Sequence, residues 1–294
     1  MAAMDDLTRE GLAAALAFQS NAGVDLALDD APHDRFAEFA RPEPARPQPR
    51  AAFPAPTNGE PPTHVAPAPV SKAPARAPNA ALAADIAAVA ASAQAQAAQA
   101  RDFEDLRARL EAFDGCALKN TATQLVFEDG ARGAQVMFVG EAPGAEEDRE
   151  GRPFVGRAGQ LLDRMLASIG LDRSLVYIAN IVPWRPPGNR TPTPQEAVAC
   201  LPFIKRQIEL CAPEILICLG APSMQALLPV KDGILKSRGK WLQVPIGARE
   251  VPAMAMLHPA YLLRQPLQKR LAWRDLRALK RVLDGERPRM HDAP

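Results

Sequence analysis

The sequence predicts an α/β fold: a three-layer αβα sandwich around a central, mostly parallel four-stranded sheet. Two observations predict it. Four short apolar runs, typical of buried strands, alternate with longer segments in which apolar residues recur at helical spacing. In addition, a glycine or a polar side chain follows or closes each apolar run. Strands that alternate with helices in this way form a parallel sheet with helices on both faces.

The region before the folded domain divides by composition into three segments. Residues 1–31 are acidic, and apolar residues near their start have the spacing of a short amphipathic helix. Residues 32–78 are rich in Pro and Ala with almost no aliphatic pattern. Because burial cannot offset the entropy of ordering them, we expect a disordered linker. Residues 79–112 are Ala-rich, and we expect one helix that docks through its second half.

The folded domain is expected to cover residues 113–285, followed by a tail at 286–294. Its expected strands are residues 135–139, 175–182, 214–219 and 252–257. Its expected helices are residues 156–170, 193–211, 221–228 and 266–284. Turn residues at Arg238-Gly239-Lys240 and at Ile246-Gly247 indicate a hairpin within residues 235–251.

Composition excludes membrane and secreted classes. No stretch approaches the roughly 20 apolar residues of a membrane helix, and no signal-peptide pattern occurs. Four cysteines in 294 residues without an export signal favour reduced thiols, so we expect a protein of the bacterial cytosol or nucleoid. Cys211 and Cys218 lie in apolar surroundings and are expected in the core.

The formal net charge of +1 conceals an asymmetry along the chain. Residues 1–40 contain eight Asp or Glu against two Arg, whereas residues 236–290 contain thirteen Lys or Arg against four Asp or Glu. A basic carboxy-terminal third suits a polyanion such as nucleic acid, and a solvated helix face is the alternative.

Function-like residues recur at the ends of the expected strands. They are Gly140 with Glu141, then Asn180, Gly220 and His258. Because open α/β sheets bind ligands at the carboxyl ends of their strands, we expect these four loops to converge on one pocket.

The first of these loops, residues 140–156, combines glycines and prolines with a cluster of carboxylates. Glycine lets a backbone approach a ligand closely. The loop has neither the Gly-x-Gly-x-x-Gly dinucleotide fingerprint nor the Gly-Lys-Ser/Thr of a P-loop. Its carboxylates are either solvated or catalytic, and Phe154 is either a core anchor or a stacking surface for a base.

Asn180 lies inside an apolar strand. A buried amide costs free energy unless both of its ends find partners, which are either a neighbouring backbone or a ligand. Uracil presents an N–H at N3 beside a carbonyl at O4, and cytosine presents the reverse. One fixed Asn can therefore discriminate the two bases.

His258 begins a His-Pro step that fixes a turn at a strand end. The Leu262-Leu263-Arg264 tip that follows is unusual for a surface loop, and insertion of apolar side chains into a base stack would explain it. The proline-containing loop from Arg185 to Arg190 suits phosphate binding, or is an ordinary connection. The further candidate DNA contacts are Arg185, Asn189, Arg190 and Lys240.

Together these motifs resemble the uracil-DNA glycosylase superfamily, most closely its family 4, over about residues 113–283. The matching segments are residues 140–144, 151–162, 180–182, 185–190 and 258–264. Their order, spacing and identity agree over more than half of the chain.

The resemblance implies a role for each motif. Phe154 would stack on a flipped uracil, Asn180 would read its edge, and His258 would stabilise the negative charge that develops on uracil O2. The loop from Leu262 to Arg264 would enter the duplex, since the glycosidic bond is inaccessible in a stacked helix.

The same resemblance implies that the backbone from Gly140 to Gly144 shapes the uracil pocket and places the attacking water. Family 1 enzymes carry an Asp for water activation at the position of Ala142, so a direct carboxylate base is absent here. Either Glu141 or Glu147 orients the water, or Glu147 instead excludes the C5 methyl of thymine.

Family 4 enzymes hold a four-iron, four-sulfur cluster on four cysteines. Cys116 and Cys200 match two of those positions, but Phe113 and Trp184 occupy the other two and cannot ligate iron. We therefore expect no cluster, no other metal and no cofactor, with aromatic packing in the place of iron.

The resemblance thus implies a monomeric, monofunctional uracil-DNA glycosylase that acts on single- or double-stranded DNA. Covalent trapping of the product is not expected, because the loop from Arg185 to Arg190 lacks the required His. The alternative is a polymerase-associated module that binds uracil-containing or abasic DNA with weak turnover. The amino-terminal segment is a candidate tether to a repair or replication protein.

Overall fold

The computed structural model describes residues 80–291, and their strands form one six-stranded sheet in the order β1-β3-β2-β4-β6-β5. The four central strands are β3 (Val176–Asn180), β2 (Val136–Gly140), β4 (Ile215–Leu219) and β6 (Arg249–Met256), and they are mutually parallel. The edge strands β1 (Asp129–Gly130) and β5 (Trp241–Ile246) pair antiparallel. The four predicted strands are confirmed, and the sheet has one further strand at each edge.

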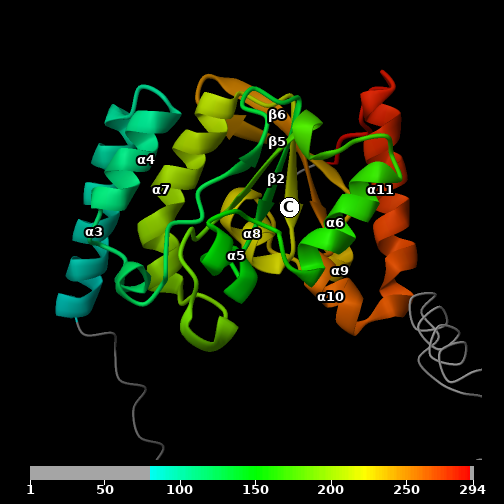
Figure 1. Ribbon diagram of the computed structural model, residues 1–294. Coiled ribbons are helices and arrows are strands. Elements are labelled where there is room, and N and C mark those ends of the chain that lie inside the picture. Colours follow the sequence, from blue (N-terminus) through cyan, green and yellow to red (C-terminus); the bar gives the residue numbers. More distant parts are fainter. Residues whose placement is uncertain (1–79, 292–294) are drawn as a thin grey trace, which may run out of the picture. The chain divides into compact units, whose positions relative to one another are not determined.

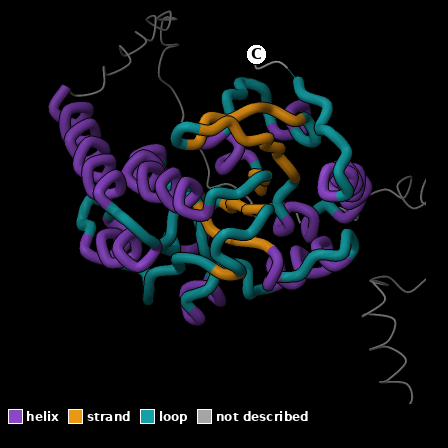
Figure 2. Tube along the Cα trace, turned by 90° about the horizontal axis from the view of Figure 1, so that it is seen from above, coloured by secondary structure: helices purple, strands orange, loops and turns teal. Residues whose placement is uncertain are grey.

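Helices cover both faces of the sheet, as predicted (Figure 1). On one side lie α3 (Ala80–Gln99), α4 (Phe103–Ala112) and α7 (Pro194–Cys211), and on the other lie α6 (Arg157–Ala167) and α11 (Lys269–Leu283). The view from above shows the same three layers, with strands between two groups of helices (Figure 2).

Strand β2 shows why the sheet forms in this segment. All five of its residues are buried, which is typical of a parallel strand covered on both faces. Because successive side chains of a strand point to opposite faces, Met137 and Val139 join the core beneath α7, while Val136 and Phe138 join the core beneath α6 and α11.

The expectation of one helix over residues 79–112 is wrong. Helix α3 ends at Gln99 and α4 begins at Phe103. Asp102 interrupts the run, because its carboxylate accepts a hydrogen bond from the Asp105 N–H at 2.8 Å and caps the second helix. Docking is not confined to the second half, since Ala93 in α3 is fully buried as well.

Short helices gather near the carboxyl ends of the strands: α5 (Ala145–Glu150), α8 (Ala221–Leu227), α9 (Ile234–Ser237) and α10 (Pro259–Arg264). Short 3₁₀ turns occur at Ala117–Asn120, Arg173–Leu175, Pro187–Asn189 and Pro266–Gln268. Only α8 was predicted, because one or two turns contain too few apolar repeats to show a helical period. The last of the 3₁₀ turns also delays the start of α11 to Lys269.

The predicted hairpin turn at Ile246-Gly247 is confirmed and joins β5 to β6. The turn residues Arg238-Gly239-Lys240 instead connect α9 to β5. Part of the expected tail is attached to the domain, because Met290 bridges to Trp241 and the His291 N–H donates to the Trp241 carbonyl at 2.8 Å.

The segments proposed for residues 1–31 and 32–78 lie outside the described residues. None of the helices within residues 80–291 combines the length and the apolar character needed to cross a bilayer.

Candidate active site

A cavity of about 650 Å³ opens at the carboxyl edge of the sheet. Glu141, Asn180, Gly220 and His258, from the ends of all four parallel strands, line it. The expected convergence of these loops is therefore confirmed. Parallel strands end on the same edge, so the fold alone brings together residues more than 100 positions apart in the chain.

The cavity contains most, but not all, of the predicted site residues. Those that line it are Glu141, Ala142, Gly144, Glu147, Phe154, Asn180, Asn189, Arg190, His258 and Arg264. Those that do not are Gly140, Arg185, Lys240, Leu262 and Leu263.

Gly140 does not line the cavity, but it lies next to residues that do. It pairs in register with Asn180 on the neighbouring strand. A Cβ at this position would lie 2.7 Å from the Phe154 ring and would collide with the Asn180 amide oxygen. Glycine is therefore the residue that lets an aromatic ring and an amide approach the same point.

Phe154 is 5% exposed, and its ring stacks on the His258 ring with centroids 5.4 Å apart and planes inclined by 30°. Its backbone has φ of 56°, in the left-handed region that non-glycine residues rarely occupy. A phenylalanine in this conformation requires support from its surroundings.

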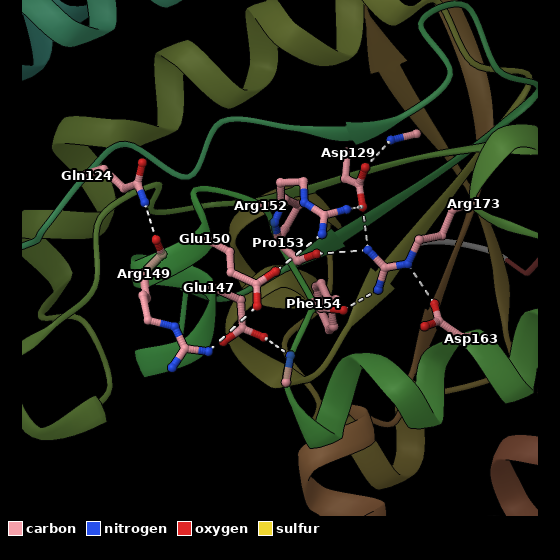
Figure 3. A network of polar contacts seen from close by, with 12 residues as sticks. Gln124, Asp129, Glu147, Arg149, Glu150, Arg152, Pro153, Phe154, Asp163 and Arg173 are labelled. Atoms are coloured by element: carbon pink, nitrogen blue, oxygen red, sulfur yellow. Dashed lines mark hydrogen bonds and ion pairs between the residues drawn. The ribbon is translucent and has the colours of Figure 1, made fainter.

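Arg173 supplies that support, and the sequence pattern did not reveal it. Its guanidinium donates to the Pro153 carbonyl at 3.1 Å and to the Phe154 carbonyl, and it forms ion pairs with Asp129 and, at 2.7 Å, with Asp163 (Figure 3). Two carboxylates thus hold the guanidinium, and the guanidinium holds the backbone beneath the aromatic ring.

Helix α6 gives the same loop a second contact, at Gly159. A Cβ there would overlap the Phe154 carbonyl group and lie 2.9 Å from the Phe154 Cα. We expect Gly159→Ala to lower the free energy of unfolding by about 3 kcal/mol, the upper end for overpacking, because both contacting groups are backbone. Urea denaturation measures the change. Gly233→Ala is the matched control, because a Cβ at Gly233 meets nothing within 4 Å and its φ of −67° suits alanine. Equal stability of the two variants would contradict the expectation.

Asn180 carries the clearest sign of a ligand-binding role. The residue is 5% exposed, yet its Oδ1 is buried and has no hydrogen-bond partner among residues 80–291. Buried polar atoms almost always have partners, and an orphan acceptor costs about 1–3 kcal/mol. The sequence left two possible partners for this amide, a neighbouring backbone or a ligand. The structure shows no backbone partner for Oδ1 among residues 80–291, so the N–H of a ligand is the partner that we infer.

His258 is held in one tautomer. It caps α10, and its Nδ1 accepts the Ala260 N–H at 3.1 Å, so the ring proton resides on Nε2. Burial, with a smaller contribution from the positive charge of Arg264, lowers the pKa of His258 to about 4. The residue is therefore a neutral hydrogen-bond donor at pH 7.

The carboxylates of loop 140–156 have different environments. Glu147 is buried, and its two oxygens accept the N–H groups of Gly144 at 3.1 Å and Gly156 at 2.9 Å. It thereby ties the two ends of the loop together. Glu141 is half-buried at the cavity wall, and this burial raises its pKa while the nearby Thr191 hydroxyl partly opposes the shift.

Both arginines of the loop after β3 form hydrogen bonds, Arg190 with helix α7 and Arg185 within the loop. Arg190 forms two hydrogen bonds with Glu196, at 2.7 and 2.8 Å, and the Arg185 Nε donates to Asn189 Oδ1 at 2.7 Å. These contacts fix the loop at the cavity rim. Lys240 is exposed just before β5 and does not line the cavity.

The expectation that Leu262 enters a duplex is not supported by its position, since its side chain is 1% exposed and belongs to the core beneath α11. The segment is helical, which turns Leu262 back toward the sheet. Leu263 is only partly exposed. The exposed leucine of this region is Leu267, at 85%, in the 3₁₀ turn that follows.

The predicted cluster positions lie in the core. Cys116, Cys200, Phe113 and Trp184 are each at most 3% exposed. The Phe113 ring packs on Phe203 with centroids 5.1 Å apart. Two thiols and two aromatic rings do not fit a cluster that needs four thiolates. Cys211 and Cys218 are buried, as predicted.

Comparison with known proteins agrees with this geometry. The family described as the uracil DNA glycosylase superfamily matches residues 127–277, just over half of the chain. The chain is 37% identical over 193 residues to a type-4 uracil-DNA glycosylase of Archaeoglobus fulgidus, which covers 64% of this chain and 97% of the relative. It is 39% identical over 186 residues to a type-4 uracil-DNA glycosylase of Thermotoga maritima, which covers 62% and 95%.

A different relative is a DNA polymerase of Bacillus phage SP01, 34% identical over 161 residues, which covers 54% of this chain and 17% of the polymerase. The match to the family covers the strands whose ends form the cavity, from β2 to β6. This chain belongs to the uracil DNA glycosylase superfamily.

Proposed function

We propose that the protein is a monofunctional uracil-DNA glycosylase, which hydrolyses the N-glycosidic bond of deoxyuridine in DNA and leaves an abasic site. The observation that carries this proposal is the unpartnered Oδ1 of Asn180 at the cavity wall. Uracil offers an N–H at N3 to that oxygen and a carbonyl at O4 to the amide nitrogen. Cytosine lacks the N3 hydrogen.

The rings around Asn180 suit a flat base. Phe154 lines the cavity with its ring stacked on His258. A base that enters the cavity stacks on this aromatic surface. Stacking of a base on an aromatic side chain contributes about 1–3 kcal/mol to the free energy of binding. The base must leave the duplex to reach the cavity, as for other enzymes that act on bases.

His258 then acts on the leaving group. As the glycosidic bond breaks, its electron pair moves into the uracil ring and negative charge develops on O2. The neutral imidazole donates Nε2–H to that oxygen, which requires the tautomer that Ala260 enforces. Because the pKa of His258 is about 4, no protonation precedes the reaction at pH 7.

Attack by water on C1′ completes the hydrolysis. Ala142 offers no carboxylate, and both oxygens of Glu147 are engaged with loop N–H groups. This arrangement supports Glu141 as the group that orients the water and Glu147 as the residue that holds the loop. We further propose that the protein works without an iron–sulfur cluster, since the residues at its positions do not fit one.

The alternative function is a uracil- or abasic-DNA-binding module with weak turnover that associates with a polymerase. Its support is the similarity to one part of the phage DNA polymerase.

An excision assay separates the two functions. Oligonucleotides with uracil in single and double strands, and matched ones with hypoxanthine or xanthine, are incubated with the protein and cleaved with alkali. We expect cleavage at uracil by the unmutated protein and none by the double variant His258→Ala with Asn180→Ala. Binding without any excess cleavage over the double variant would reject the enzyme and favour the binding module.

A further inference from the structure

Helix α11 carries a row of four exposed arginines, Arg270, Arg274, Arg277 and Arg281, which we call the arginine stripe. Their spacing of four, three and four residues places them on one face of a helix with 3.6 residues per turn. The residues that α11 buries against the sheet lie on the opposite face: Ala272, Asp275, Leu276 and Leu279.

Two other basic side chains on or beside this helix form ion pairs, whereas no ion pair among the described residues involves the stripe. Arg238 forms an ion pair with the buried Asp275, and Lys280 forms one with Asp284. Among residues 80–291, none of the four stripe arginines has a carboxylate oxygen within 4.0 Å of its guanidinium nitrogens. Like charges three or four residues apart on a helix repel each other, so the stripe is unfavourable unless an anion binds it.

The stripe begins beside the candidate active site. Arg264, the last residue of α10, lines the cavity, and the 3₁₀ turn Pro266–Gln268 leads directly into α11. In Figure 1, α10 and the first turns of α11 lie together, and α11 then runs away from the carboxyl edge of the sheet. The stripe therefore starts six residues after a residue that lines the cavity.

We propose that the arginine stripe binds the phosphate backbone of the DNA that flanks the flipped nucleotide on one side. This inference rests on the proposed function, because it takes DNA as the ligand of the adjacent cavity. The whole chain has a net charge of only +1, so the stripe is a local concentration of charge and not a reflection of a basic protein.

The dimensions suit a nucleic acid strand. At 1.5 Å per residue, Arg270 to Arg281 spans about 16 Å. Each strand of B-DNA carries a phosphate about every 3.4 Å of helix axis, so several successive phosphates fit along this length when the protein helix lies along the DNA axis. Guanidinium groups bind phosphate oxygens in pairs of hydrogen bonds. Trp273, which borders the stripe and is 47% exposed, adds a flat surface for an unpaired base.

The test compares two variants that each lose three positive charges. The first is R274Q/R277Q/R281Q, which leaves the position nearest the cavity intact. The control is R101Q/R107Q/K205Q, which removes exposed charges from the connection between α3 and α4, from α4 and from α7. Glutamine keeps the helix propensity of arginine, and circular dichroism checks that both variants fold.

The measurement is the dissociation constant for uracil-containing DNA as a function of salt, by fluorescence anisotropy. One oligonucleotide carries the uracil near its 5′ end and another carries it near its 3′ end. Relative to the control variant, we expect the stripe variant to bind one of the two at least about 10-fold more weakly at 0.1 M salt, with a salt slope smaller by about 2. In the other oligonucleotide the DNA next to the uracil extends away from the stripe, so its dissociation constant should change much less.

Equal dissociation constants and equal salt slopes for the two variants on both oligonucleotides would overturn the proposal and leave an acidic protein as the partner of this face. An equal loss on both oligonucleotides would overturn its one-sided geometry. Excision by the unmutated protein is scored separately. Absent excision rejects the proposed function, whereas a null binding result with normal excision rejects only the stripe.

Discussion

His258→Ala is expected to lower the rate constant of uracil excision at saturating DNA by about 10²–10³-fold, the usual cost of removing one donor from a developing oxyanion. The imidazole is the group placed to donate to uracil O2, and its Nδ1 bond to Ala260 aims the Nε2 proton toward the cavity. Single-turnover excision of uracil from an oligonucleotide measures the rate constant. A loss smaller than tenfold would contradict this role.

The pH profile gives an independent check on the same residue. The folded-state pKa of His258, about 4, lies below its ordinary value, so the neutral form persists down to about pH 5. Below that, a protonated Nδ1 cannot accept the Ala260 N–H, and excision by the unmutated protein should fall as pH falls toward 4. An inflection near pH 6.5 that is absent from His258→Ala would show that the imidazole titrates normally.

Asn180→Ala is expected to reduce uracil excision by about 10²-fold or more, because it removes two hydrogen bonds to a desolvated base, at about 1–3 kcal/mol for each group left unpaired. The same substitution should leave the free energy of unfolding unchanged or raise it, since it removes a buried acceptor that has no partner among residues 80–291. Single-turnover excision and urea denaturation measure the two effects.

Gln207→Ala is the matched control for a buried amide. Its Nε2 donates to the Phe127 carbonyl at 3.0 Å and to the Tyr177 hydroxyl at 2.7 Å, and none of these three residues lines the cavity. It should destabilise the fold and spare excision at saturating DNA. If Asn180→Ala instead destabilises the protein as Gln207→Ala does and excises uracil normally, the amide is structural and reads no base.

Much of the site can be predicted from the sequence, because each strand end is a local feature and the α/β fold brings all four strand ends together. Each buried strand is recognisable in the sequence as a short apolar run. Because the strands are parallel, the residues at their carboxyl ends, Glu141, Asn180 and His258, lie at one edge of the sheet. The supports of the site were not predictable in this way. Arg173 reaches the Phe154 backbone through contacts between separate elements, which leave no periodic trace in the sequence.

Glu147 shows the same limit within a single loop. Its position among four acidic residues suggests catalysis or solvation, whereas its two bonds to Gly144 and Gly156 make it a tie between loop ends. Residue type indicates which groups can act. Only the direction of each side chain shows which of them do so.

The amino-acid sequence by itself determined the three-layer fold, the four converging strand ends and the family, because hydrophobic period and motif spacing are properties of the chain alone. The tertiary structure decided which side chains face outward. It buried Leu262 in the core and left Leu267 exposed. It also placed Arg270, Arg274, Arg277 and Arg281 in one exposed row along α11. Direction depends on where a helix begins and on what its other face buries, and neither is fixed until the layers have packed.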